Sequence, residues 1–270
     1  MVVQHNMQAM NTNRQLGITT SAQAKSTEKL SSGFRVNRAA DDAAGLSISE
    51  KMRSQIRGLN KASSNAQDGV SLVQTAEGAL NETHSILQRM NELATQAAND
   101  TNTSVDRGAI QKEIDQLTSE IDRIRSTTQF NTMNLLDGSF TGKNLQVGAL
   151  SGQKIELSIK NMDAATLKVD ALDVSSFDSA GDAMDAIQAA IDTVSDQRSA
   201  LGAVQNRLEH TIANLDTTSE NTQAAESRIR DTDMASEMVT YSKNNILAQA
   251  GQSMLAQANQ STQGVLSLLQ

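Results

Sequence analysis

Apolar and small residues recur every three or four positions from Leu46 to Ala98, which is the period of a helix with one buried face. The chain contains no proline to interrupt it. At about 1.5 Å per residue, this pattern predicts a helix roughly 80 Å long. Inside it, Gly58, Gly69 and Gly78 each cost about 1 kcal/mol relative to Ala, so we expect neighbouring helices to approach closely there. The seam consists of Leu59, Ala62, Ala66, Val70, Val73, Ala76, Leu80, Thr83, Leu87, Met90, Ala94 and Ala97.

Two further helical patterns follow, and they supply partners for the first. A cluster of turn-forming residues from Asn99 to Ser104 separates the long helix from a heptad pattern. A third helix is predicted from about Ala180 to Leu215. We expect the three helices to pack as one slender antiparallel bundle. The two added seams are Ile110, Ile114, Leu117, Ile121 and Ile124, and then Ile187, Ala190, Val194, Leu201, Val204, Leu208 and Leu215.

Between these helices, from Phe130 to about Phe177, the period changes to two. Gly148 and Gly152 bracket a turn between alternating apolar residues, which predicts a β-hairpin. Asp137 and the glycine after it predict another turn. The alternating residues are Leu145 and Val147 before the turn, then Ile155, Leu157 and Ile159, with Val169, Leu172 and Val174 as a candidate short strand.

The two ends of the chain carry very little charge. Residues 1–33 form either a polar tail that frays in the free monomer or a helix that orders when it meets a partner. In residues 234–270 the only charged side chains are Glu237 and Lys243, and apolar residues fall on more than one helical face. If the ends pair, apolar surface remains for neighbouring molecules, and a repeated contact that does not close generates a helical filament.

The pattern as a whole predicts a mainly α fold, a long antiparallel helical bundle or coiled coil with a small β-hairpin region. We expect two domains. Residues 1–45 and 234–270 form a terminal helical domain with its connector, and residues 46–233 form an outer bundle that includes the β-hairpin region 130–178. Asp41 and Asp42 precede the long helix, so we interpret them as capping residues rather than paired catalytic carboxylates.

Composition narrows the function further. Aromatic residues make up 2% of the chain and Trp is absent, which suits narrow helix–helix seams. The formal net charge of -8, with no basic cluster, argues against a nucleic-acid partner. There is no cysteine, so disulfides and thiolate metal sites are excluded. We find neither a signal peptide at the N-terminus nor the roughly 18 continuous apolar residues of a membrane span.

Several segments resemble bacterial flagellin, the filament subunit of the flagellum. They are KLSSGFRVNRAADDAAGLSISEKMRSQIRGL at 29–59, NAQDGVSLVQTAEGALNETHSILQRMNELATQAAND at 65–100, TQFN at 128–131, RIRDTDMASEMV at 228–239 and the ending VLSLLQ. The resemblance covers nearly the whole chain, and many identical short segments occur in the same order as in the family. It implies a structural protein, not an enzyme, in a short form that lacks the large variable outer domains.

The resemblance implies that the termini form the core of an extracellular filament that drives swimming. It also implies export through the flagellar type III apparatus, an export chaperone for the C-terminal segment, and contacts with hook-associated and cap proteins. No cofactor, metal or membrane insertion is implied. We expect the polymerisation seam to include Val3, Met7, Met10, Leu247, Met254, Leu255, Val265, Leu266, Leu268 and Leu269.

The family is also sensed by a vertebrate Toll-like receptor, and the matching positions here are Gln88, Arg89, Leu93 and Glu113. Arg89 offers a planar donor fork, Leu93 an apolar patch, and Glu113 is expected on the same side of the bundle. The alternative is an ordinary surface used between subunits. We favour that role in the bacterium, with the receptor exploiting the same surface.

One departure from the family pattern is Thr262, where related chains often carry proline, so the last helix is expected to continue without a kink. An enzyme remains a rival interpretation, but His5, His84 and His210 are far apart and no nucleophile or phosphate-binding motif accompanies them. A hook–filament junction protein and a chemoreceptor signalling rod are the other rivals. A junction protein shares with this chain the apolar terminal segments. A chemoreceptor signalling rod is entirely helical, so it does not account for the alternating segment at 155–159.

Overall fold

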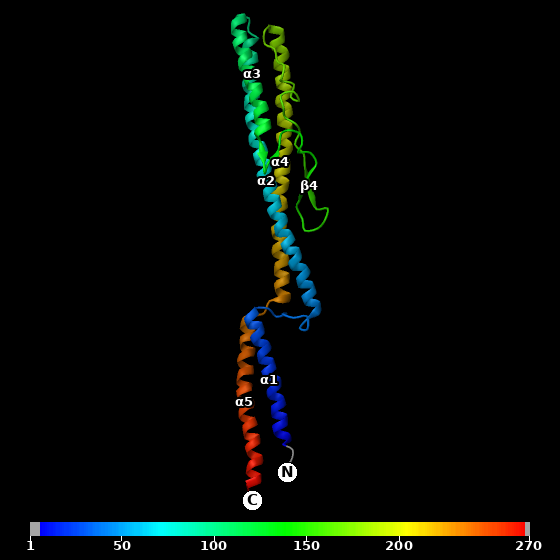
Figure 1. Cartoon of the computed structure of the whole chain (residues 1–270), viewed down its shortest axis with the longest axis vertical. Helices are drawn as coiled ribbons and strands as arrows, with labels where there is room; N and C mark the ends of the chain where they lie inside the picture. The colour runs from blue at the N-terminus through cyan, green and yellow to red at the C-terminus, as the bar shows by residue number, and fades with distance from the viewer. Residues whose placement is uncertain (1–5, 268–270) are drawn as a thin grey trace. The chain divides into compact units, whose positions relative to one another are not determined.

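The computed structural model describes the backbone of residues 6–267 and the side chains of residues 6–261. The described residues form five helices and two small antiparallel sheets (Figure 1). The backbone divides into two compact units. Unit 1 comprises residues 1–54 and 220–270, and unit 2 comprises residues 55–219. The mainly α fold predicted from the periodicity is therefore confirmed.

Three long helices follow the predicted seams. The helix α2 spans Ala43–Ala97, α3 spans Ser104–Thr127 and α4 spans Phe177–Arg230. A short loop reverses the chain between α2 and α3, and α3 opens with a capping box in which Thr103 and Asp106 satisfy each other's backbone N–H groups. Within unit 2, α3 and α4 both run antiparallel to α2 (Figure 1).

The core of unit 2 is the shared seam of these helices. Leu80, Leu87 and Met90 of α2 are fully buried together with Ile114 and Ile121 of α3. The residues from 135 to 174 close the cluster from the side, and apart from Leu157 at the end of a strand their side chains are buried in it from irregular backbone. The large buried residues of this segment are Leu135, Leu136, Phe140, Leu157, Ile159, Met162, Leu167, Val169 and Val174.

The helix α4 is longer than predicted, because it continues for 15 residues beyond Leu215 to Arg230. The apolar periodicity stops there, but polar residues take over the buried positions. In unit 2, the Ser219 hydroxyl donates to Asn60 Oδ1 over 2.7 Å. In unit 1, Ser49 Oγ donates to Glu226 Oε1 over 3.1 Å, and both residues are buried. Hydrogen-bonded polar side chains therefore continue the buried face of α4 beyond the point where the apolar periodicity predicts the end of the helix.

The predicted β-hairpin is confirmed. The strand β3 spans Lys143–Gln146 and pairs antiparallel with β4, Lys154–Leu157. A smaller pair joins β1, Gln129–Phe130, to β2, Met133–Asn134. The candidate strand at 169–174 is not formed, because Val169 and Val174 bury themselves in the bundle core from irregular backbone.

The hairpin explains two of the three helical glycines. A Cβ at Gly58 would lie 2.8 Å from the Cβ of Ala149, and a Cβ at Gly69 would lie 2.7 Å from Leu145 Cδ1. What approaches closely is therefore the β3–β4 hairpin, and only at Gly69 does a helical residue of α4 also come near. Gly78 has open space around it, so the expectation of close packing is wrong at that position.

Unit 1 contains the terminal helices, α1 at Met7–Ser32 and α5 at Met234–Ser267. Asn6 caps α1 by accepting a hydrogen bond from the Ala9 N–H, and Gly33 ends it with φ 76°. The N-terminal segment is thus helical from Met7 to Ser32 in this structure. The backbone of α5 stays helical through position 262, as expected from the absence of proline there.

Candidate assembly interface

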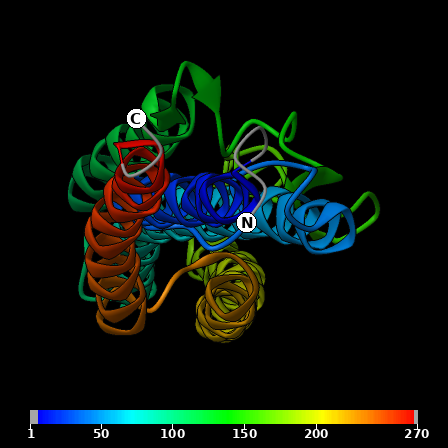
Figure 2. The ribbon, with the colours of Figure 1, turned by 90° about the horizontal axis from the view of Figure 1, so that it is seen from below.

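The helices α1 and α5 form an antiparallel pair inside unit 1 (Figure 1, Figure 2). Two polar contacts set its register. At one end, Asn6 Nδ2 donates to the Ala258 carbonyl over 3.0 Å. At the other end, Lys29 Nζ lies 3.7 Å from Glu237 Oε2. Between them the helices come close enough that a Cβ at Gly251 would sit 3.3 Å from Leu16 Cδ1.

Large apolar side chains on this pair point into solvent. They belong to Met7, Met10, Ile18, Met234, Met238, Val239, Ile246, Leu247 and Met254. A groove with a volume of ≈ 430 Å³ also runs between the helices, lined by Thr12 and Leu16 on one side and by Leu247 and Met254 on the other. Many large exposed apolar side chains on one pair of helices are typical of a protein–protein interface.

Most of the predicted seam residues that can be located lie on this surface. Met7, Met10, Leu247 and Met254 are exposed, whereas Leu255 is half-buried. Val265 and Leu266 lie on the α5 backbone but their side chains are outside the described residues, and Val3, Leu268 and Leu269 lie outside them altogether. The predicted seam omitted five exposed residues that a search for apolar residues on every face of these helices would have found: Ile18, Met234, Met238, Val239 and Ile246.

A second feature of unit 1 joins the connector to the end of α4. Arg35 N donates to the Arg230 carbonyl over 2.6 Å, and Thr232 N donates to the Gly33 carbonyl over 3.0 Å. The Phe34 ring lies 4.5 Å from the Arg230 guanidinium carbon, a cation–π contact. Sequence periodicity missed this contact, because its residues are nearly 200 positions apart and lie at the end of α4 or in the connectors between helices.

Asp42 begins α2 in the capping role predicted for it. Its Oδ1 accepts a hydrogen bond from Gly45 N over 2.8 Å, which satisfies one of the free N–H groups of the first turn. Asp41 instead accepts from Arg38 N and approaches Lys25, so it stabilises the connector. Neither carboxylate is arranged with the other for acid–base chemistry.

On unit 2, the predicted receptor surface is organised by an ion pair. Arg89 Nε and Nη2 both donate to Glu113 Oε1, over 3.1 and 2.9 Å, and Nη1 donates to Glu92 Oε2 over 3.1 Å. The hydrogen bond with Glu113 and, to a smaller extent, the one with Glu92 raise the pKa of Arg89. Gln88 lies beside it, with its amide nitrogen 3.0 Å from His84 Nε2. The structure therefore holds Arg89 as an oriented, exposed cation.

Leu93 differs from its predicted role. It was expected to offer an apolar patch, but only 2% of it is exposed, and it belongs to the core of unit 2. The reason is the helical period, since Leu93 lies three residues after Met90 and next to Ala94, on the face of α2 that meets the other helices. It supports the surface from below instead of forming part of it.

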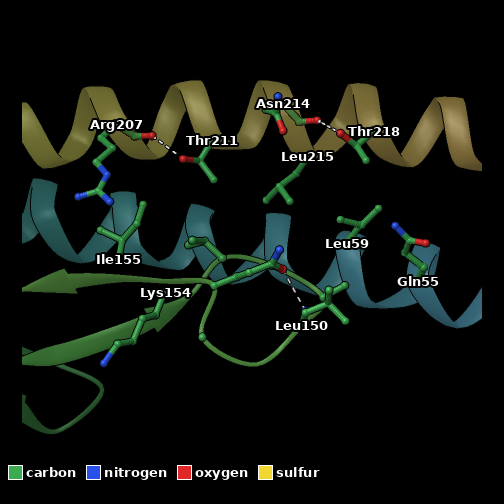
Figure 3. Close-up of a pocket in the computed structure, with 15 residues that line it drawn as sticks. Gln55, Leu59, Leu150, Lys154, Ile155, Arg207, Thr211, Asn214, Leu215 and Thr218 are labelled. Atoms are coloured by element: carbon green, nitrogen blue, oxygen red, sulfur yellow. Dashed lines mark hydrogen bonds between the residues drawn. The ribbon is translucent and has the colours of Figure 1, made fainter.

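A pocket of ≈ 420 Å³ lies between the hairpin turn and the helices α2 and α4 (Figure 3). Thr211 and Thr218 line it, but their hydroxyls donate to the carbonyls of Arg207 and Asn214 in their own helix. Leu150 at the turn is anchored by its N–H to Gln153 Oε1 over 3.0 Å. The charged residues of the lining are Lys154 and Arg207, and no Asp, Glu or His accompanies them in it.

Within the described residues, no three His, Asp or Glu side chains are grouped so that they could hold a metal ion. His84 lies on α2 and His210 on α4, and His5 is outside the described residues. Over the described range, no helix is long and apolar enough to cross a membrane.

The bundle of unit 2 buries its own apolar seam, whereas the α1–α5 pair exposes large apolar residues. These two features define the class: a helical structural protein with an apolar surface that is available for other molecules. Comparison with known proteins identifies the family. The model for the bacterial flagellin N-terminal helical region matches residues 3–141, and the model for the bacterial flagellin C-terminal helical region matches residues 184–269. This chain belongs to the bacterial flagellin family.

Individual relatives agree over the full length. The chain is 58% identical to a flagellin of Halalkalibacterium halodurans and 53% identical to a flagellin of Bacillus subtilis, with 100% of each chain covered in both cases. It is 51% identical, again over 100% of both chains, to the flagellar filament 31.3 kDa core protein of Treponema maltophilum. The crystal structure of Bacillus cereus flagellin matches 60% of this chain and 94% of its own, with a TM-score of 0.51 and 33% identity.

Proposed function

We propose that this chain is the repeating subunit of an extracellular flagellar filament, and that it assembles through the α1–α5 pair. One observation carries the proposal. The pair exposes Met7, Met10, Leu247 and Met254 on helices that are almost free of charge. Water solvates such a surface poorly, and burying it against the same surface of other copies is favourable at about 25 cal/mol per Å².

The distribution of charge supports the same division of labour. The acidic excess of the chain lies in unit 2, whereas unit 1 is close to neutral. Repulsion between acidic units keeps the bundles soluble, while nearly neutral terminal helices approach each other with little electrostatic cost. A contact that repeats between identical copies without closing produces a helical polymer.

Membership of the family extends this proposal to the route by which the subunit reaches the filament. We infer export through the flagellar type III apparatus, with a chaperone that covers the C-terminal segment until then. The exposed apolar residues of α5 are the surface that needs such cover in the free chain. Hook-associated and cap proteins are the expected neighbours at the two ends of the polymer, and their terminal helices are the natural partners for α1 and α5.

The assembly proposal is tested with one charged substitution and one truncation. Leu247→Glu places a charge on the exposed face, and removal of residues 234–270 takes away α5 entirely. We expect wild type to extend filament seeds, seen by electron microscopy, and both variants to remain monomeric. Val105→Glu is the matched control, because Val105 is 79% exposed but lies on α3 of unit 2. Normal filaments from either variant would show that α5 is not the assembly element.

We also propose that the exposed surface of Gln88, Arg89 and Glu113 contacts neighbouring subunits and is recognised by a vertebrate Toll-like receptor. The two hydrogen bonds from Arg89 to Glu113 Oε1 orient the Arg89 fork and leave its side chain half-exposed. Arg89→Ala is expected to weaken receptor binding in a surface-plasmon-resonance measurement without changing the far-UV circular dichroism. Arg123→Ala is the control, since Arg123 forms a similar exposed pair with Glu120 elsewhere on α3. Equal affinity for both variants and wild type would exclude this surface.

A further inference from the structure

Three exposed methionines lie at the end of the α1–α5 pair where the start of α1 meets the later part of α5. Met7 and Met10 lie three residues apart on α1, so they share a face, and they are 69% and 64% exposed. Met254 on α5 is 58% exposed. The hydrogen bond from Asn6 to Ala258 places these two residues side by side in the antiparallel pair. Met10 follows Asn6 by four residues and Met254 precedes Ala258 by four, so Met10 and Met254 lie at the same level along the pair. We name these three residues the methionine patch.

The methionines of unit 2 offer an internal comparison. Met90 and Met162 are 0% and 1% exposed, since both belong to the bundle core. Met133 on β2 is 42% exposed, and Met234 and Met238, at the other end of the α1–α5 pair, are 47% and 49% exposed. Because oxidants reach a thioether through solvent, the methionine patch, Met133, Met234 and Met238 are accessible in the folded subunit while the core residues are protected.

The surroundings of the patch make a polar change costly for assembly. From residue 244 to residue 267 the chain has no charged side chain, and Arg14 is the only charged residue between residues 6 and 24. The adjoining groove is lined by Leu16, Leu247 and Gly251, with Asn11 and Gln15 as uncharged polar neighbours. A strongly polar atom placed in this surface loses its hydration when a second copy covers it, and no charged side chain of these segments compensates the loss.

We propose that the methionine patch is a reversible oxidation site that controls subunit addition, an inference that rests on the proposed role of the terminal pair in assembly. The oxidant is a peroxide. The thioether sulfur attacks one peroxide oxygen, the O–O bond breaks, a sulfoxide S–O bond forms and the second oxygen leaves as water after proton transfer. Sulfur is oxidised by two electrons and the peroxide is reduced. The sulfoxide converts an apolar contact into a polar one, and a methionine sulfoxide reductase restores it.

The test uses the full-length chain. Monomer is treated with hydrogen peroxide, the excess is removed with catalase, sulfoxides are mapped by peptide mass spectrometry, and elongation of filament seeds is followed by light scattering. We expect Met7, Met10 and Met254 to be modified at rates similar to Met133, Met234 and Met238, and well before Met90 and Met162. Elongation by the oxidised monomer is expected to be about tenfold slower and to recover after reductase treatment.

Substitution by Leu separates the patch from other oxidised sites. The triple variant M7L/M10L/M254L is expected to elongate at the same rate before and after peroxide, whereas M133L should lose elongation as wild type does. The three single variants replace the triple variant if the latter no longer extends seeds untreated. Circular dichroism of the oxidised chain confirms that its helices remain.

Two results would overturn the inference alone: full oxidation of the patch in wild type with unchanged elongation, or equal loss of elongation in the patch variants and M133L. Failure of untreated wild type to extend seeds is a different result, because it would overturn the proposed assembly function and the inference with it.

Discussion

The bundle of unit 2 and the α1–α5 pair of unit 1 use the same helical geometry but dispose their apolar residues in opposite ways. In the bundle, Leu87, Met90 and Ile114 are buried in a continuous seam. In the terminal pair, Ala258 and Ser26 are buried, while large residues such as Met10 and Leu247 face solvent. The first arrangement stabilises a single chain, and the second leaves stabilisation to be gained from other chains.

The comparison shows that apolar content does not by itself indicate a monomer core. Both regions have helical periodicity, and α5 has the higher mean hydropathy along its length, yet the bundle has the larger core. What differs is the number of helices that surround each apolar face. Three helices and the segment 135–174 enclose the seam of unit 2, whereas two helices of a pair can cover only one face of each other.

The largest expected difference between the two regions is in the response to truncating a leucine. Leu87→Ala removes a fully buried side chain, and we expect it to lower the free energy of unfolding by about 2–5 kcal/mol. Leu247→Ala removes one that is 47% exposed, and we expect a change within about 0.5 kcal/mol together with strongly reduced assembly. Urea denaturation followed by circular dichroism, with seeded growth beside it, measures both. Similar destabilisation by the two variants would mean that the terminal pair is itself a core.

A smaller effect is expected in the polar seam that prolongs α4. Glu226 accepts from Ser49 and lies 3.7 Å from Arg53. Glu226→Ala leaves the buried Ser49 hydroxyl without this partner, so we expect a loss of about 1–3 kcal/mol. Glu220→Ala, at an exposed position of the same helix, is the control and should change stability little. Hydrogen exchange along residues 43–54 and 220–230 locates the effect, and equal exchange in the two variants would remove the polar seam from the list of stabilising features.

The helical glycines test how closely the hairpin approaches α2. Gly78→Ala places a methyl group in open space and is expected to raise the free energy of unfolding by about 1 kcal/mol. Gly58→Ala places it 2.8 Å from Ala149, so the same gain in helix propensity is opposed by displacement of the hairpin turn. Faster hydrogen exchange at residues 147–153 in Gly58→Ala alone is the expected signature. An equal gain in stability from both substitutions would contradict the close contact.

The smallest effect concerns the cap of α3 at low pH. Hydrogen bonds from the Thr103 hydroxyl and then from its backbone N–H lower the pKa of Asp106. Its contribution to stability is therefore complete above the unfolded pKa of about 3.9 and is lost as the pH falls through the lower folded pKa. Thermal melting should show wild type slightly more stable than Asp106→Asn at neutral pH, with the difference vanishing in acid. A difference that persists or grows in acid would assign the effect to something other than the carboxylate.

Much of this architecture could be predicted because helical periodicity is a local property. The seams from Leu59 to Ala97 and from Ile110 to Ile124 predicted α2 and α3, and the alternation around Ile155 predicted the hairpin. The end of α4 was wrong, since the positions after Leu215 are buried through polar pairs that hydrophobic counting does not detect. The exposed patch assigned to Leu93 was wrong for a related reason: a leucine between two seam positions belongs to whichever face the neighbouring helices cover.

The sequence by itself determined that this chain is helical, divided by one β-hairpin, poor in charge at both ends and a member of the flagellin family. These conclusions need only local spacing, composition and the order of recognisable segments. The tertiary structure alone decided which apolar residues are buried and which are exposed. It also decided that the hairpin packs on Gly58 and Gly69, and that Phe34 contacts Arg230. Burial and exposure depend on which elements from distant parts of the chain cover a given face, and the spacing of residues along one helix does not contain that information.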